Sequence, residues 1–236
     1  SSSTSAFVSG VVPDKVRPAD SKWAEAYLGE QPPHLVMPPE VRELAARIVG
    51  SERNPYRKAE RIFRWFDKEF RYCSEMNYAV MPSVVEKAMA ERTGDCGVHA
   101  LLFIALCRAS GVPARWQSGW VARPDYWNMH DWAEFYVEPY GWLPADPSVG
   151  LQRSDDLRVR DFLFGNTDAY RMIANLGFDT AFEPREDHWR SDPVDSQKGE
   201  VQWRGGNLYL GQWDSDIRGE VEPRGAADTG PAGEPR

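Results

Sequence analysis

The chain has 236 residues, 42% of them hydrophobic, which is enough to bury one substantial core. Its 36 acidic residues outnumber 28 Lys and Arg, giving a formal net charge of −8 at pH 7. Because no basic stripe offsets this charge, nucleic acid and anionic membranes are excluded as expected partners. The longest apolar run is too short and too interrupted to cross a bilayer, so no integral membrane segment is expected.

Composition divides the chain into four segments, and no internal repeat is visible. Scattered Pro, Gly and Ser indicate an N-terminal arm, whereas aromatic residues spread beyond the core predict a folded extension. A tail of Gly, Pro and charged residues is typical of disorder. The expected segments are an arm at 1–39, a core at 40–150, an extension packed on the core at 151–218 and a disordered tail at 219–236.

Three helices are predicted in the first half of the core. Apolar residues at helical spacing over 41–48 and 59–70 predict two amphipathic helices. The segment 83–86, Ser-Val-Val-Glu, is a capping-box pattern that opens a third helix. A tight loop at 92–95 is expected to follow, with Gly94 permitting the turn.

The next helix is expected to be buried on all sides. Residues 98–107 are apolar nearly all round, and Gly111 follows them. Asp95 is a good N-cap residue and places Cys96 in the first turn, where backbone N–H groups and the helix dipole favour a negative sulfur. The pKa of this thiol is therefore expected to fall. Cys107 lies about 16 Å further along the helix, too far for a disulfide, and is expected to be core.

Antiparallel strands are predicted after this helix. Residues 114–121 and 131–137 are rich in strand formers, and a turn at 138–141 precedes a third short strand that ends at Asp146. Strands joined by so short a turn are antiparallel neighbours. His130, at the start of one strand, and Asp146, at the end of the next, are therefore expected side by side.

The order Cys96, His130, Asp146 has a chemical meaning. A thiol is a weak nucleophile until it is deprotonated, so the chemistry needs an imidazole beside the sulfur. A carboxylate must in turn fix the tautomer of that imidazole. Since three cysteines cannot all pair within one chain, one free functional thiol is expected.

Four motifs occur in one order along the chain: Gly94-Asp95-Cys96, Gly111-Val112-Pro113-Ala114-Arg115, His130-x-Trp132-x-Glu134 and Gly141-Trp142-x-Pro144-x-Asp146-Pro147. Together they resemble the bacterial transglutaminase-like superfamily over residues 56–150. The resemblance implies a papain-like α+β fold, in which a buried helix bearing the nucleophile packs on an antiparallel sheet. It assigns Cys96 as nucleophile, His130 as general base and acid, and Asp146 as the orienting carboxylate.

What the resemblance implies is a cysteine hydrolase or acyltransferase. Such an enzyme acts on a peptide, protein or small amide substrate, or on an ester, through a thioester intermediate. The alternatives are an amide-forming enzyme of the transglutaminase or N-acyltransferase type, and a catalytically silent binding module with the same fold. No cofactor or metal is expected, and no calcium loop is present in the sequence. The chain begins at Ser1 without methionine, and export with a removed signal peptide is one interpretation of this start. The sequence does not otherwise predict the compartment.

Candidates for the oxyanion hole and the substrate contacts are less specific. Tyr78 and Gln117 have suitable donors by residue type, and the backbone N–H of Cys96 is a further contributor. Trp132 is expected to pack over the triad, and Trp127, in the loop before His130, to face substrate.

Two further polar residues have alternative roles. His99 lies one turn after Cys96 and is expected near the site or facing substrate, with a zinc-ligand role as the weaker alternative. Glu134 shares a strand face with His130 and either touches the cleft or pairs with Arg115 inside the protein. In the extension, a helix or turn is predicted at 155–164, and a hairpin is predicted from strands at 200–203 and 207–210.

Overall fold

The fold is known from a computed structural model that describes most of the chain. The described residues are 10–19, 22–74, 77–123, 126–148, 156–194, 197, 199–209, 211–216 and 218. The predicted disordered tail at 219–236 and residues 1–9 of the predicted arm lie outside the described residues.

The helices predicted from periodicity and capping are present. Asn54 caps the second helix by accepting a hydrogen bond from Arg57 N, and Ser83 caps the third by accepting one from Glu86 N, as the capping pattern predicts. The α-helices are α1 (Pro39–Val49), α2 (Pro55–Glu69), α3 (Val84–Glu91), α4 (Cys96–Ala109) and α5 (Leu157–Phe162), and 3-10 turns occur at Pro13–Lys15, Lys22–Tyr27 and Tyr78–Val80.

The central sheet is antiparallel throughout, with the strand order β5-β4-β3-β6. Two smaller pairings join β1 to β2 in parallel and β7 to β8 in antiparallel orientation. The strands are β1 (Arg71–Tyr72), β2 (Thr93–Gly94), β3 (Ala114–Arg123), β4 (Tyr126–Val137), β5 (Gly141–Ala145), β6 (Arg171–Asn175), β7 (Gln202–Trp203) and β8 (Gly206–Asn207).

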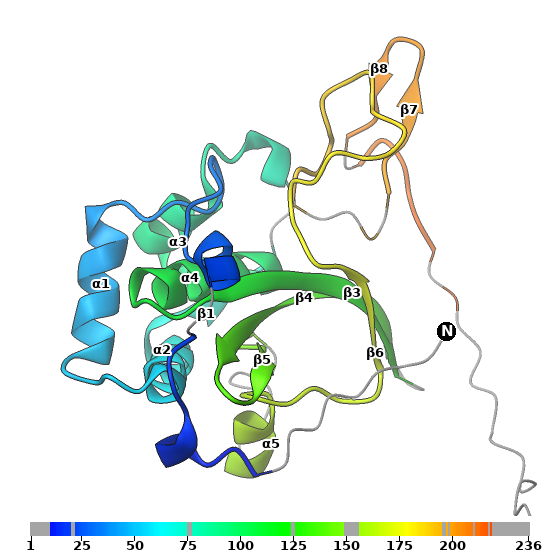
Figure 1. Cartoon of the computed structure of the whole chain (residues 1–236). Coiled ribbons are helices and arrows are strands. Elements are labelled where there is room, and N and C mark those ends of the chain that lie inside the picture. Colours follow the sequence, from blue (N-terminus) through cyan, green and yellow to red (C-terminus); the bar gives the residue numbers. More distant parts are fainter. Residues whose placement is uncertain are drawn as a thin grey trace, which may run out of the picture.

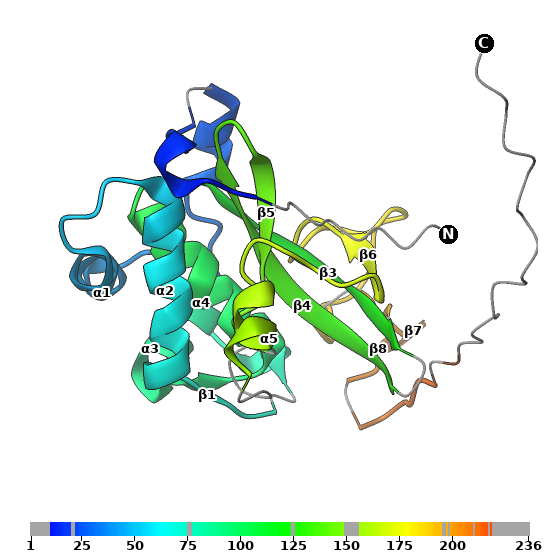
Figure 2. The same cartoon turned by 90° about the horizontal axis from the view of Figure 1, so that it is seen from below.

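Helices and sheet form two layers, and α4 lies between them. Figures 1 and 2 show α1, α2 and α3 gathered around α4 on one side of the long strands β3 and β4. Every residue of α4 from Gly97 to Arg108 is buried, which confirms the predicted all-round burial. Phe103 of α4 packs edge-on against Phe135 of β4, so the helix is fixed directly on the strand that carries His130.

The hairpin of β3 and β4 is longer than the sequence predicts. The two strands pair from Ala114 with Phe135 to Arg123 with Tyr126. His130 therefore lies inside β4, and the expectation that it starts the strand is wrong. The expected loop position of Trp127 is also wrong, because Trp127 belongs to β4 and pairs with Ala122. Cross-strand pairing over the full length of β3 extends the strand beyond its local propensity.

Gly94 serves close packing rather than a turn. The left-handed residue in this connection is Arg92, with φ 56°, at the C-cap of α3. Gly94 lies in β2, where a Cβ atom would come within 2.3 Å of Val98 Cγ1 in the first turn of α4. The expectation that Gly94 provides the turn is therefore corrected: a hydrogen atom at this position lets β2 approach α4.

The C-terminal extension contributes to the central sheet and to the helical layer. Strand β6 pairs with the outer edge of β3, with an irregularity at Ser118 and Gly119. The helix expected at 155–164 is present as α5, with Asp155 outside the described residues, and its Asp161 forms an ion pair with Arg64 of α2.

The hairpin expected near the end of the chain is present as the short pair β7 and β8. Its strands are shorter than predicted, and Leu210 lies outside the described residues. This hairpin extends away from the two layers in Figure 1.

We expect Gly94→Ala to destabilise the protein by about 1–3 kcal/mol, because the added methyl group overlaps Val98 and forces β2 away from α4. Urea unfolding followed by circular dichroism measures this change. Gly29→Ala is the matched control, since a Cβ atom there meets nothing within 4 Å. Equal stability of the two variants would contradict the packing role of Gly94.

Candidate active site

Cys96 is the first residue of α4, and its position is set by the helix cap before it. The Asp95 carboxylate accepts a hydrogen bond from Val98 N at 3.2 Å, as expected of an N-cap residue. The Tyr78 hydroxyl donates to the same Asp95 oxygen and fixes the cap from the opposite side. Cys96 itself is partly exposed, in contrast to the residues that follow it in α4.

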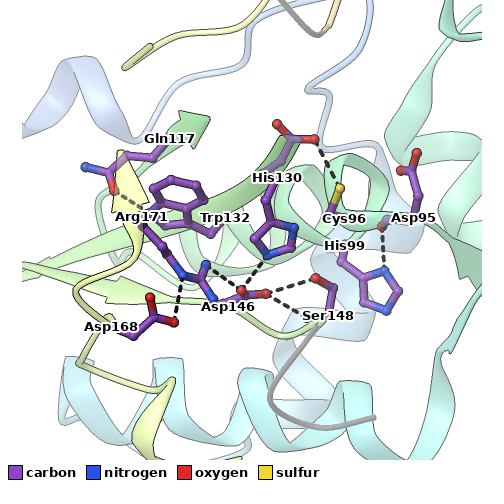
Figure 3. A network of polar contacts seen from close by, with 11 residues as sticks. Asp95, Cys96, His99, Gln117, His130, Trp132, Asp146, Ser148, Asp168 and Arg171 are labelled. Carbon is purple, nitrogen blue, oxygen red and sulfur yellow. Dashed lines mark hydrogen bonds and ion pairs between the residues drawn. The ribbon is translucent and has the colours of Figure 1, made fainter. Parts of the chain in front are cut away.

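His130 and Asp146 form a buried pair. The distance between His130 Nε2 and Asp146 Oδ2 is 2.6 Å, and both side chains are nearly inaccessible. Since Nε2 faces the carboxylate, Nδ1 is the ring nitrogen left to accept a proton from a nucleophile. In the view of Figure 3, the His130 ring is drawn between Asp146 and Cys96. Trp132 stacks on the imidazole with ring centroids 5.9 Å apart, as expected of a residue packed over the triad.

The Asp146 carboxylate has more partners than the sequence suggests. Arg171 Nη1, on β6, forms an ion pair with Asp146 Oδ2 at 2.6 Å. Ser148 donates to Oδ1 through its backbone N–H and its hydroxyl, at 3.1 and 2.9 Å. Burial alone would raise the pKa of Asp146, but the charges of His130 and Arg171 and their hydrogen bonds hold it far below its usual range. This carboxylate is therefore ionised at every physiological pH.

A second carboxylate, that of Asp131, lies against the Cys96 sulfur. Cys96 Sγ donates to Asp131 Oδ2 at 3.3 Å, the contact dashed from Cys96 in Figure 3. Gln197 Nε2, from the C-terminal extension, donates to Asp131 Oδ1 at 3.0 Å. Asp131 and Arg171 were not among the site residues predicted from the sequence. Period-two alternation could have revealed Asp131, because it places this residue on the face of β4 that packs on α4.

His99 is buried rather than facing substrate. It has no exposed surface, and the aromatic rings of Phe66, Phe70 and Tyr72 surround it. Its Nδ1 lies 2.7 Å from the Asp95 carbonyl oxygen, which requires the proton on this nitrogen. Burial lowers the pKa of His99 to about 4, although the hydrogen bond to Asp95 opposes the shift. His99 is therefore neutral at pH 7 and supports the turn that carries Cys96.

The remaining candidates lie at different distances from the nucleophile. Tyr78 is close to the first turn of α4, because a Cβ atom on Gly97 would come within 2.4 Å of its hydroxyl. Gln117 accepts a hydrogen bond from the Trp132 indole and lies beyond Trp132 from Cys96 in Figure 3. Trp127 is partly exposed on β4. The structure thus brings Tyr78 toward Cys96 but not Gln117.

Glu134 pairs with Arg115, which was one of its two expected roles. Arg115 Nε donates to Glu134 Oε2 at 2.6 Å, and the guanidinium lies over the Trp142 ring at 4.2 Å. Burial raises the pKa of Glu134, and the charge and hydrogen bond of Arg115 counteract this effect. This pair stabilises the sheet behind the site.

Within the described ranges, no group of three or more His, Cys, Asp or Glu side chains is arranged to hold a metal ion. No helix in this part of the chain has the length and apolar character needed to cross a membrane.

A buried helix that begins at a cysteine, packed on an antiparallel sheet that carries a histidine–aspartate pair, defines the papain-like class of α+β folds. Comparison with known families agrees, because residues 42–147 match the model of the transglutaminase-like superfamily. Over these residues the chain is similar to that superfamily.

Individual relatives are distant. An uncharacterized protein of Haemophilus influenzae is 27% identical over an alignment of 203 residues, and the match covers 69% of this chain and 54% of the relative. A Cytophaga hutchinsonii structure, described provisionally as a cysteine protease, is 21% identical with a TM-score of 0.47, covering 64% of this chain and 47% of that one. The periplasmic domain of TgpA from Pseudomonas aeruginosa is 22% identical with a TM-score of 0.46, over 61% and 52% of the two chains. The chain thus spans about half the length of each protein.

The buried state of His99 predicts a pH dependence of stability. The unfolded state takes up a proton near pH 6.5, whereas the folded state resists protonation down to about pH 4. Stability is therefore lost as the pH falls from 6.5 to 4, by up to about 3 kcal/mol from this group. His99→Phe should flatten the dependence in this window, as measured by urea unfolding at several pH values.

The control for this experiment is His188→Phe, which alters a partly exposed histidine and should leave the profile unchanged. An equally steep profile in His99→Phe would mean that other groups cause the loss of stability in acid.

Proposed function

We propose that this protein is a cysteine hydrolase that cleaves peptide or amide bonds through a thioester on Cys96. The observation that carries the proposal is the buried pair of His130 and Asp146, whose carboxylate bond leaves Nδ1 of the imidazole as the proton acceptor. Three supports combine here: the fold, the superfamily match over residues 42–147, and a partly exposed cysteine at a helix start.

The proposed reaction has two halves. The thiol proton passes to His130 Nδ1 as the sulfur attacks the amide carbonyl, and the backbone N–H of Cys96 stabilises the developing oxyanion. The same proton then passes to the leaving amine, so that an acyl thioester and a free amine result. In the second half, His130 takes a proton from water as the water oxygen attacks the thioester. The Cys96 sulfur then leaves and receives this proton from His130, so that a free carboxylic acid and the Cys96 thiol result.

Asp146 has a fixed role in this sequence. Because Arg171 and Ser148 hold its two oxygens, the carboxylate keeps the imidazole in one orientation and one tautomer. Its ionised state stabilises the imidazolium that forms when His130 carries the proton.

The deciding experiment is the detection of an acyl adduct on Cys96. The protein is exposed to a library of peptides and simple amides, and intact mass is measured after rapid acid quenching. A mass increase that matches an acyl group and is absent in Cys96→Ala supports the proposal. Added alkylamines test the amide-forming alternative, because they would divert the thioester into new amides. A protein that forms no adduct with any amide or ester would be a binding module.

Cys96 should be the fast-reacting thiol among the three cysteines. Cys107 is fully buried, and burial raises the pKa of its thiol well above the ordinary value, so it should react only after unfolding. Cys73 is partly exposed but begins no helix. Iodoacetamide labelling of the folded protein, read peptide by peptide in a mass spectrometer, should modify Cys96 first. Faster labelling of Cys73 would exclude Cys96 as the activated thiol.

Substitutions should distinguish the roles of Cys96 and His130, as nucleophile and base, from the role of Asp146, which orients the imidazole. Cys96→Ala and His130→Ala should each abolish turnover of the substrate found, and the double variant should lose no more, because the two act as one unit. Asp146→Asn should slow turnover by about two orders of magnitude or more, since the amide favours the wrong tautomer. Steady-state rates are the measurement, with Asp161→Asn as the surface control. Near-normal turnover in a folded Asp146→Asn protein would reduce the triad to a dyad.

A further inference from the structure

The Asp131 carboxylate lies at the start of α4, where the helix N-terminus would otherwise favour a negative sulfur on Cys96. Its Oδ2 accepts the Cys96 thiol hydrogen at 3.3 Å, and the side chain is 1% exposed. A Cβ atom built on Gly97 would lie 3.3 Å from the same oxygen, so the carboxylate rests directly on the first turn of α4. Backbone N–H groups and the positive end of the helix dipole stabilise an anion there. In the resting protein, the anion that the helix N-terminus stabilises is the Asp131 carboxylate.

His130 and Asp131 approach the nucleophile from different faces of one strand. Consecutive residues of β4 point to opposite sides of the sheet. Asp131 shares its face with Ala133 and Phe135, which pack in the core against α4. His130 shares its face with Trp132, whose indole stacks on the imidazole. The thiol therefore has a carboxylate on the helix side and the base on the other.

The geometry of the contact favours a neutral sulfur. Only a protonated thiol can donate to a carboxylate, and a thiolate at the same position would face a like charge at 3.3 Å. Gln197 Nε2 donates to the other oxygen of Asp131 and holds the carboxylate in place from the C-terminal extension. Gln197 is itself tied to the sheet, because its carbonyl oxygen accepts a hydrogen bond from the Trp120 indole at 3.2 Å.

We infer that Asp131 is a positioning residue that holds resting Cys96 as a neutral, oriented thiol. The inference rests on the proposed role of Cys96 as nucleophile. It assigns the loss of the thiol proton to the moment of attack, when the proton leaves the Asp131 contact and binds His130 Nδ1. Among the described residues, the titratable or charged groups near this contact include Asp95 and His99 at the start of α4 and Tyr78 of the 3-10 turn at 78–80. Cys73, whose N–H donates to the Gly94 carbonyl oxygen, and Asp146 with Arg171, which pair beyond His130, complete this group.

The test is the pH profile of Cys96 alkylation in the full chain. Iodoacetamide rates are measured from pH 5 to 10 and assigned to Cys96 by peptide mass spectrometry. Asp131→Asn keeps the shape of the side chain and removes its charge, so the midpoint should fall by about one pH unit. At pH 7 the rate should rise about tenfold. Asp131→Glu restores the charge and should move the midpoint back toward that of the natural protein.

Two controls separate charge from local disorder. Asp14→Asn removes one negative charge from a side chain that is 81% exposed, and should not move the midpoint. Gln197→Ala loosens the carboxylate but keeps its charge, so its midpoint should stay in place or rise. If Asp131→Asn does not fold, Asp131→Ser takes its place with the same expectation.

The outcomes distinguish this inference from the proposed function. An unchanged or higher midpoint in a folded Asp131→Asn protein overturns the role of Asp131, even if Cys96 forms acyl adducts. A lowered midpoint in a protein that forms no acyl adduct supports the control of the thiol by Asp131 and overturns the proposed hydrolysis. If Cys96 resists alkylation in both the natural protein and Asp131→Asn, both fail.

Discussion

The enclosure of α4 is the constraint on which the rest of the structure depends. A helix with apolar side chains on every face is stable only when neighbours cover all of them. Helices α1, α2 and α3 cover one side of α4, and the strands β3 and β4 cover the other (Figure 2). Because Cys96 is its first residue, packing along the whole helix determines where the sulfur lies.

A second constraint is the charge on Asp146. A carboxylate that is 2% exposed is costly unless cations and hydrogen-bond donors surround it. Its partners come from β4, from the turn after β5, and from β6, so the charge connects three parts of the chain. The His130 imidazole is thereby held in one orientation by the protein itself.

The features that the sequence predicted are those with a local cause. Helix α4, its Asp95 cap and the Ser83 cap follow from residues within one or two turns of each other, and the structure confirms them. The superfamily and the α+β fold class were also predicted correctly from the motifs. Strand length was underestimated, because pairing with β3 continues β4 through residues 126–130, across Asn128, a weak strand former. The contacts of Arg171 and Gln197 join residues far apart in sequence, and no local sequence pattern predicts such contacts.

The pairing of Arg171 with Asp146 makes the site depend on residues outside the segment that matches the superfamily. The segment that matches the superfamily ends at residue 147, yet the guanidinium that neutralises the buried carboxylate arrives on β6, and the amide that holds Asp131 arrives from Gln197. The charge balance around the proposed nucleophile, base and orienter is therefore completed by chain outside the matched segment. A substitution in the extension can thus change the electrostatic surroundings of Cys96 and His130 while leaving both residues in place.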